Sequence, residues 1–224
     1  ECTGEYMFTI NKLKEIVMKK SREEKLTHFY SLCKEGMAVL DVGVSSESGA
    51  GTPARNYFLK NFKYDSKYYT GLGVQDLSEM NNLFSGKTFV QYQGGKFPFE
   101  DNQFDWVFSN AVIEHVGNDE AQLLFINEML RVAKNVFFTT PNKYFPIEAH
   151  TNIFFLHWNN SIFYHWCKKH KTWVTRDNLY LLSSGRLRRL MNLSNAASYE
   201  LKKNRLFTLV MTYTVTCTKS ETHS

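Results

Sequence analysis

Short apolar runs alternate with segments of helical periodicity over most of the chain. The apolar runs lie at 37–43, 68–74, 87–92, 104–111 and 135–141. Helical patterns lie between them at 53–61, 76–84 and 119–133, and one or two further helices are expected over 9–35. This alternation is typical of a parallel sheet covered by helices on both faces. It therefore predicts an α/β fold with five parallel strands.

The C-terminal part follows a different pattern. Residues 198–206 and 207–219 are both strand-like, and only a brief break separates them. Neighbouring strand-like runs pair as an antiparallel hairpin, which we expect at the edge of the sheet. The prediction is thus a mostly parallel sheet of seven strands within one domain covering 1–224.

The loop after the first apolar run combines an acid, a glycine and several serines. The stretch from Val39 to Gly51 reads VLDVGVSSESGAG, and Thr52 and Pro53 are expected to begin the helix that follows. The loop lies beyond the carboxyl end of a parallel strand, where open α/β sheets bind ligands. Gly43 lets a ligand approach the backbone, and Asp41 can accept hydrogen bonds. Taken alone, the loop fits a ligand cradle and a plain strand-to-turn connection equally well.

The composition indicates the cellular compartment and limits the kinds of binding partner. With 224 residues, 43% of them hydrophobic, the chain is long enough for one packed domain. The cysteines at 2, 33, 167 and 217 form no CxxC pair, which indicates reduced thiols and a cytoplasmic protein. The formal net charge of +5 permits an anionic partner without requiring one. No signal peptide is evident and no apolar stretch reaches roughly 18 residues, so no membrane span is expected.

Several stretches resemble the class I S-adenosylmethionine-dependent methyltransferases, and within them the methyltransferase type 11 family. VLDVGVSSESG resembles the first glycine loop, YYTGLGVQDLSEM the second strand with its acid, and FVQYQGGKFPFEDNQFDWVFSNAVIEHV the adenine loop and fourth strand. FTTPNKYFPIEAHTNIFFLHW is similar to bacterial members associated with cell-surface polysaccharide genes. The resemblance covers residues 37 to 190 and implies a Rossmann-like fold. It also implies an enzyme that uses S-adenosylmethionine and releases S-adenosylhomocysteine.

The resemblance implies a cofactor site at the carboxyl ends of the first strands. The residues it assigns there are Asp41, Gly43, Val44, Ser45, Asn56, Gln75, Asp76, Gln93, Gly94, Ser109, Asn110, Ala111 and His115. Asp76 or Gln75 would hold the ribose, and we favour Asp76 because a carboxylate accepts from both hydroxyl groups. Gln93 stands where the family usually has an acid, so its hydrogen bond to the adenine amino group would be neutral and weaker. The first loop lacks the second and third glycines of the family pattern.

Two histidines are candidates for the chemistry of methyl transfer. The protein must position both substrates, and a hydroxyl acceptor additionally needs a base, a role that suits histidine. His150, after the fifth strand, is either this base or a structural hydrogen-bonding group, and His115 is expected to shape the pocket. Glu148 and Glu114 would orient an imidazole or bind sugar hydroxyls, or else be ordinary surface carboxylates, which we favour for Glu114.

The segment 145–173 is the most aromatic and least regular part of the chain, within an insertion over 142–182. We interpret it as a cap over the active site. Its rings suit the faces of sugars or bases, and they equally suit a small core of the cap's own. The cap also contains His157, His165, Cys167 and His170, but these lack the paired spacing of a zinc site, so no metal is expected.

These observations predict O-methylation of a sugar or sugar-linked small molecule in surface polysaccharide biosynthesis. An N-methyltransferase acting on a small amine or on RNA and a non-catalytic cofactor-binding protein are the alternatives. Basic runs at 168–171 and 186–189 would suit nucleic acid, but TTPN follows the fifth strand in place of a base-methylating signature, which disfavours that acceptor. The aromatic, basic cap is also compatible with peripheral membrane contact.

Overall fold

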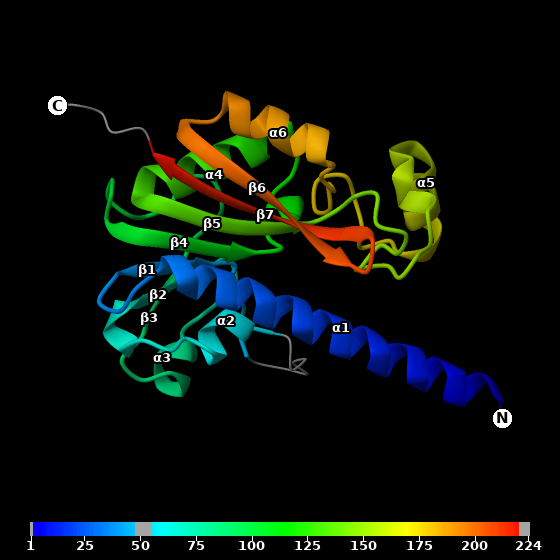
Figure 1. The fold of residues 1–224 in the computed structure, drawn as a ribbon, viewed down its shortest axis with the longest axis horizontal. Coiled ribbons are helices and arrows are strands. Elements are labelled where there is room, and N and C mark those ends of the chain that lie inside the picture. The colour runs from blue at the N-terminus through cyan, green and yellow to red at the C-terminus, as the bar shows by residue number, and fades with distance from the viewer. Residues whose placement is uncertain (1, 48–54, 220–224) are drawn as a thin grey trace.

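The computed structural model describes residues 2–47 and 55–219, which form one seven-stranded sheet with flanking helices (Figure 1). The strand order is β3-β2-β1-β4-β5-β7-β6. The strands are β1 (Val39–Val42), β2 (Tyr69–Gly73), β3 (Thr88–Gln91), β4 (Phe104–Asn110), β5 (Ala133–Pro141), β6 (Ala196–Leu206) and β7 (Leu209–Lys219). The first five pair in parallel, and β7 lies antiparallel between β5 and β6. The predicted fold class, including the C-terminal hairpin, is confirmed.

Helices cover both faces of the sheet. They are α1 (Cys2–Leu32), α2 (Tyr57–Lys60), α3 (Met80–Leu83), α4 (Asp119–Val132), α5 (Asn160–His170) and α6 (Ser184–Leu193), with 3₁₀ turns η1 (Ser66–Tyr68), η2 (Ile113–His115) and η3 (Leu156–Trp158). Figure 1 shows α4 and α6 on one side of the sheet and the long α1 crossing the other side. The segment that contains α5, which we interpret as a cap, projects at one end of the molecule.

Alternation along the strands divides the core between the two faces. Neighbouring residues of a strand point to opposite faces, so Val107 packs with α4 while Phe108 packs with α1. Phe29 of α1 is fully buried, and its ring contacts Phe108 and Phe137 edge-on at centroid distances of 5.1 and 5.5 Å. This aromatic contact fixes α1 against the centre of the sheet, next to the strand ends that form the site.

Two predicted helices are shorter than expected. Asn56 has a left-handed φ of 51°, so α2 begins only at Tyr57. The predicted helix start at Thr52 and Pro53 lies outside the described residues. The side chain of Asp76 accepts a hydrogen bond from the Ser78 amide, and the resulting turn delays α3 until Met80.

The cap is more regular than the sequence suggests. It contains α5, which Asn159 caps by accepting a hydrogen bond from the Ile162 amide. The cap has a small core of its own, made by Phe163, Cys167, Val174, Leu179 and Leu181. Other cap rings, among them Phe154 and Trp158, are exposed. The aromatic residues therefore divide between a core and an exposed surface. Helix α6, which was not predicted from the sequence, follows this segment.

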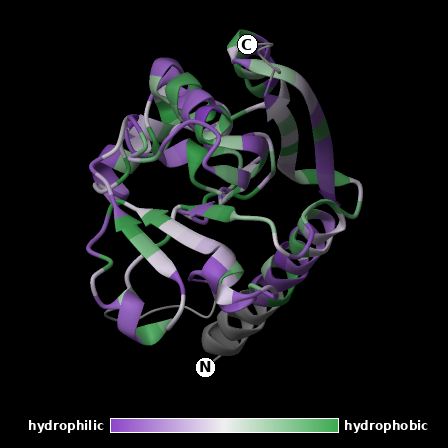
Figure 2. Cartoon of the chain, turned by 90° about the vertical axis from the view of Figure 1, so that its left-hand side faces the viewer, coloured by the Kyte–Doolittle hydropathy of each residue, from purple (hydrophilic) through white to green (hydrophobic). Residues whose placement is uncertain are grey.

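The outer strand of the C-terminal hairpin is largely polar. Figure 2 shows hydrophilic residues along much of β6, in agreement with its mostly exposed side chains. Polar, charged side chains on an edge strand discourage pairing with another chain. Within the described ranges, no helix is long and apolar enough to cross a membrane.

Candidate active site

The carboxyl ends of β1 and β4 open into a first cavity of about 200 Å³. Five of the predicted cofactor residues line it, namely Asp41, Gly43, Ser45, Asn56 and Asn110. Arg22 and Lys25 of α1 also line it. The cavity therefore lies where open α/β sheets bind ligands, between the strand ends and the N-terminal helix.

Gly43 makes the sharp bend after β1. Its φ is +105°, and a Cβ atom there would lie 2.3 Å from Cγ2 of Val112. The amides of Gly43 and Val44 both donate to the carbonyl of Leu72, at 2.9 and 3.1 Å. Glycine is required here by backbone conformation and by the close approach of the loop after β4.

The serine-rich part of the loop is held by side chains from outside it. The Ser45 amide donates to Oδ1 of Asn56, and the Ser46 amide donates to Oε1 of Gln75, both at 3.0 Å. Because these amides already have partners, the described part of the loop is not an anion cradle. It instead shapes one wall of the first cavity.

Asp41 is the buried acid of the first cavity, 7% exposed. The Tyr69 hydroxyl donates a hydrogen bond of 2.5 Å to its Oδ2. Burial raises the pKa of the Asp41 carboxyl to about 7, and the hydrogen bond from Tyr69 opposes that rise. A cationic ligand group next to Asp41 would favour its ionised form.

Arg22 and Lys25 were not identified from the sequence. They lie one turn apart on α1, and Lys25 is only 8% exposed. Burial lowers the pKa of the Lys25 ammonium to about 8. Two cations facing a cavity can bind a carboxylate. Their spacing of three residues was visible in the sequence, but only the packing of α1 shows that they face the cavity.

The remaining predicted cofactor residues lie outside the first cavity. Val44 and Ser109 are buried, with 4% and 1% exposure, so their side chains belong to the interior. Gln75, Asp76, Gln93 and Gly94 are exposed at the ends of β2 and β3. The predicted cofactor residues therefore divide between the first cavity, at the ends of β1 and β4, and an open surface at the ends of β2 and β3, where adenosine is expected.

A second cavity of about 640 Å³ adjoins the first and shares Arg22, Lys25 and Asn110 with it. Its walls are mostly apolar and include Val17, Met18, Ala111, Phe145, Ile147, Phe154, Leu181, Leu206 and Met211. Glu148 and His157 are among its polar lining residues. A cavity of this size and composition is typical of a site for a small molecule with an apolar body.

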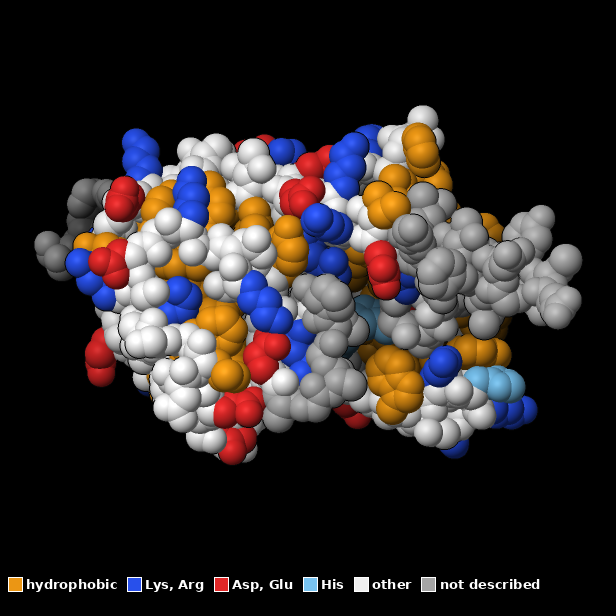
Figure 3. Space-filling model, turned by 90° about the horizontal axis from the view of Figure 1, so that it is seen from below, with side chains coloured by type: hydrophobic (Ala, Val, Ile, Leu, Met, Phe, Trp, Pro, Cys, Tyr) orange, Lys and Arg blue, Asp and Glu red, His pale blue; other side chains and the backbone are white. Residues whose placement is uncertain are grey.

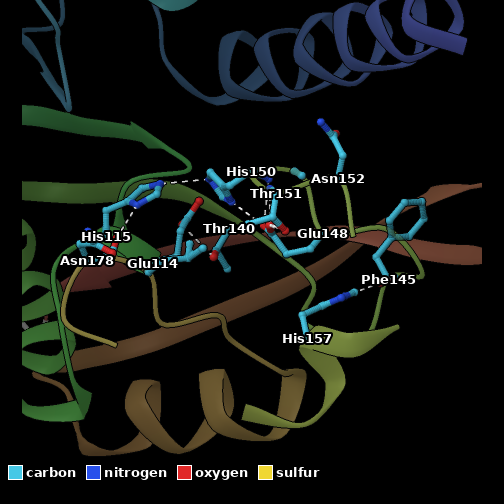
Figure 4. Close-up of polar contacts among 12 residues, drawn as sticks. Glu114, His115, Thr140, Phe145, Glu148, His150, Thr151, Asn152, His157 and Asn178 are labelled. Carbon is cyan, nitrogen blue, oxygen red and sulfur yellow. Dashed lines mark hydrogen bonds and ion pairs between the residues drawn. The ribbon is translucent and has the colours of Figure 1, made fainter. Parts of the chain in front are cut away.

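Two histidines meet beside these cavities (Figure 4). The Nε2 atoms of His115 and His150 lie 3.1 Å apart, and the rings are nearly perpendicular. Nδ1 of His115 lies 2.8 Å from the Asn178 carbonyl oxygen, and Nδ1 of His150 lies 2.5 Å from Oε1 of Glu148. Each ring thus presents Nδ1 to an acceptor and Nε2 to the other ring.

Glu148 holds the turn that carries His150. It is 3% exposed and accepts hydrogen bonds from the His150 amide and from the amide and hydroxyl of Thr151. Burial alone would raise the pKa of Glu148, but these donors and the His150 ring hold it at about 2. Burial alone would lower the pKa of His150, but the interaction with Glu148 raises it by more. The pKa of His150 therefore lies above its ordinary value. Glu148 is therefore a buried, ionised partner of His150 and not a surface carboxylate.

Glu114 also contradicts the expectation of a surface position, because it is completely buried. It lies next to His115 in η2, and its Oε2 accepts a hydrogen bond of 3.0 Å from the Thr140 hydroxyl. Its Oε1 has no hydrogen-bond partner among the described residues. The 3₁₀ turn after β4 directs Glu114 inward while leaving His115 exposed, which sequence periodicity does not reveal.

The cap histidines do not meet one another. Nε2 of His157 donates a hydrogen bond to the Phe145 carbonyl oxygen, because a carbonyl can only accept. Cys167 belongs to the cap core, and the His170 ring stacks on Trp166 at 4.9 Å. His165 is exposed. Within the described residues, these side chains form no common site.

The basic run at 186–189 is partly structural. Arg186 donates to Asp119 and Gln122, and its guanidinium lies 3.5 Å from the centre of the Tyr180 ring. On the face seen in Figure 3, Lys and Arg side chains are interspersed with acidic and apolar ones. Neither feature is the continuous basic surface typical of nucleic-acid binding.

Comparison with known proteins agrees with this architecture. Residues 40–136 match the family model of a methyltransferase domain. The chain is 32% identical over 117 residues to a sterol 24-C-methyltransferase of Gibberella zeae, an alignment that covers 49% of this chain and 28% of that protein. The matching region thus spans less than a third of the curated relative.

Solved structures share the fold at low sequence identity. A methyltransferase of Methanosarcina mazei has a TM-score of 0.54 at 15% identity, covering 87% of this chain and 96% of that one. Phosphoethanolamine N-methyltransferase 2 of Haemonchus contortus, solved with phosphomonomethylethanolamine and S-adenosylhomocysteine, has a TM-score of 0.58 at 12% identity, covering 88% and 52%. Both contain the same Rossmann-like arrangement.

Proposed function

We propose that this chain, which carries a class I S-adenosylmethionine-dependent methyltransferase domain, methylates a hydroxyl group of a small-molecule acceptor. The observation that carries the proposal is the meeting of His115 and His150, with their Nε2 atoms 3.1 Å apart, beside two joined cavities. An amine can lose its proton to water before it attacks. A hydroxyl group needs a partner that takes its proton during transfer, and the histidines supply one.

The first cavity suits the amino-acid end of the cofactor. Arg22 and Lys25 would bind its carboxylate, and Asp41 would accept hydrogen bonds from its ammonium. The adenosine end would then extend past Gly43 toward the open ends of β2 and β3. There we propose Asp76 for the ribose hydroxyls, since Gln75 already binds the Ser46 amide, and Gln93 with Gly94 for the adenine.

The second cavity suits an acceptor with an apolar body. Phe145, Leu181 and Met211 are among its walls, whereas a bare sugar would require more polar partners. A lipid-linked sugar or another amphipathic alcohol could contact both the apolar walls of the second cavity and the exposed rings of the cap. A role in surface polysaccharide biosynthesis is supported only by the resemblance of residues 138–158.

S-adenosylmethionine supplies a methyl group that is already activated on a sulfonium. The cavities position the donor and acceptor and exclude water. The Nδ1–H group of His150 donates a hydrogen bond to Glu148, so Nε2 carries the lone pair that takes the hydroxyl proton. With the cofactor bound, its methyl group would pass to the acceptor oxygen and leave S-adenosylhomocysteine, and Glu148 would stabilise the charge that develops on His150.

An acceptor screen tests the proposal, with formation of S-adenosylhomocysteine as the readout. It should include lipid-linked sugars, other amphipathic alcohols, nucleotide-linked sugars, amines and RNA. We expect turnover on a hydroxyl acceptor with an apolar part. Turnover on amines or RNA, with none on any alcohol, would refute O-methylation while leaving the methyltransferase assignment intact.

A further inference from the structure

The two facing imidazole nitrogens require a positive charge between them. Nδ1 of His115 faces the Asn178 carbonyl and Nδ1 of His150 faces the Glu148 carboxylate, so both Nδ1 atoms carry hydrogen. A neutral ring that is protonated at Nδ1 has only a lone pair at Nε2. Two such lone pairs lie 3.1 Å apart here, and they repel one another unless a proton or a metal ion lies between them.

Glu114 supplies a third group to the same position. Its carboxylate is fully buried, its Oε1 has no partner among the described residues, and Figure 4 shows it extending toward the His150 ring. Ligand atoms of Glu114, His115 and His150 all lie within 4.8 Å of one another. Each of these three side chains can therefore contribute one ligand atom to a single ion.

The spacing agrees with metal coordination. Two nitrogen ligands at about 2.1 Å from one ion, at angles between tetrahedral and octahedral, lie about 3.0 to 3.4 Å apart. The observed separation of 3.1 Å falls in this range. A carboxylate and a backbone carbonyl that accept the other ring N–H are also the usual partners of metal-binding histidines. Glu148 and Asn178 take these places.

We infer that Glu114, His115 and His150 bind one divalent transition-metal cation such as Zn²⁺. Two imidazoles and one carboxylate select such ions over Mg²⁺ or Ca²⁺ and leave coordination positions open. His115 is exposed, so an acceptor hydroxyl can reach the open positions. Coordination would lower the pKa of that hydroxyl, so that its proton could pass to solvent water before methyl transfer. The ion would then replace Nε2 of His150 as the group that activates the acceptor oxygen. Metal binding itself does not depend on the proposed methyl transfer.

Metal titration of the full chain tests this inference. The protein is first treated with a chelator, then titrated separately with ZnCl₂ and CoCl₂, and bound metal is measured by elemental analysis and by the visible spectrum of Co²⁺. We expect one ion per chain. Glu114→Gln, which keeps an acceptor for Thr140, and His115→Ala should each weaken binding by about 100-fold or more, since even outer-shell partners contribute 10- to 100-fold. His165→Ala, an exposed cap histidine, should bind as the wild type does.

Two results would overturn the inference. One is the absence of stoichiometric Zn²⁺ or Co²⁺ binding at millimolar concentration. The other is equal affinity of the wild type, Glu114→Gln and His115→Ala. His115 is exposed, so its replacement keeps the test valid if the buried Glu114 variant fails to fold. The titration contains no cofactor or acceptor, so its failure is distinct from failure of the proposed methyl transfer.

Discussion

His115 and His150 are 35 residues apart in sequence, yet their Nε2 atoms lie 3.1 Å apart. The relationship arises because β4 and β5 are parallel neighbours whose carboxyl ends reach the same edge of the sheet. The first histidine follows β4 in η2, and the second follows β5 in the turn held by Glu148. The sheet thus assembles a paired site from two separate loops.

The first prediction concerns His150. Its replacement by alanine should lower turnover by about 100-fold or more, the usual loss when a group that activates the acceptor is removed. Affinity for S-adenosylhomocysteine should stay nearly unchanged, because His150 lies outside the first cavity. Steady-state kinetics and calorimetry measure the two quantities, with His165→Ala as the control. Full turnover of the His150 variant would remove this residue from the mechanism.

The second prediction concerns Asp41 and pH. Its pKa in the folded protein is about 7, above the ordinary value of 3.8, so between these values the folded protein retains a proton that the unfolded chain has lost. Unfolding releases that proton. The free energy of unfolding without cofactor should therefore fall as pH rises from 3.8 to about 7, and level off above it.

Asp41→Asn isolates this contribution, because the asparagine does not ionise. Urea unfolding at about pH 5 and about pH 8 should show a smaller decrease in stability for the variant than for the wild type. Glu148, whose pKa is held at about 2, changes stability only at lower pH and does not interfere. An equal decrease in both proteins would assign the pH dependence to another group.

The third prediction concerns the basic wall of the first cavity. Arg22→Ala and Lys25→Ala should each weaken S-adenosylhomocysteine binding by about 1.5 to 3 kcal/mol, as expected for a hydrogen bond to a charged group. Methylthioadenosine lacks the amino-acid part, so its affinity should be nearly unaffected. Comparable losses for both ligands would show that these residues do not bind the carboxylate.

The fourth prediction distinguishes the two ribose candidates. Asp76→Ala should weaken cofactor binding by about 1 to 3 kcal/mol if the carboxylate holds the ribose hydroxyls. Gln75→Ala removes the acceptor for the Ser46 amide and should have the smaller effect. Calorimetry on the two variants decides between them. A loss confined to the Gln75 variant would transfer the ribose role to Gln75.

The strands were predictable because strands that are buried on both faces of a sheet appear in the sequence as continuous apolar runs. The runs at 104–111 and 135–141 became β4 and β5 within a few residues of the expected limits. Helix limits were less predictable. Asn56 adopts a left-handed conformation to bind the loop at Ser45, and that tertiary contact, which determines where α2 begins, has no local sequence signal.

The site was predictable only where it follows strand ends. Asp41, Gly43 and Asn110 line the first cavity, and their part in cofactor binding stays a prediction. Arg22 and Lys25 were missed because helical spacing alone does not show which face of α1 meets the sheet. The burial of Glu114 was also missed, since it depends on the 3₁₀ turn after β4 and on the hydroxyl of Thr140.

Calorimetric titration of the wild-type protein with S-adenosylmethionine and S-adenosylhomocysteine tests the central claim most directly. The claim is that the cavity between α1 and the ends of β1 and β4 holds the cofactor. It predicts one binding site per chain for each ligand and competition between the two. Absence of binding for both ligands at millimolar concentration would contradict it.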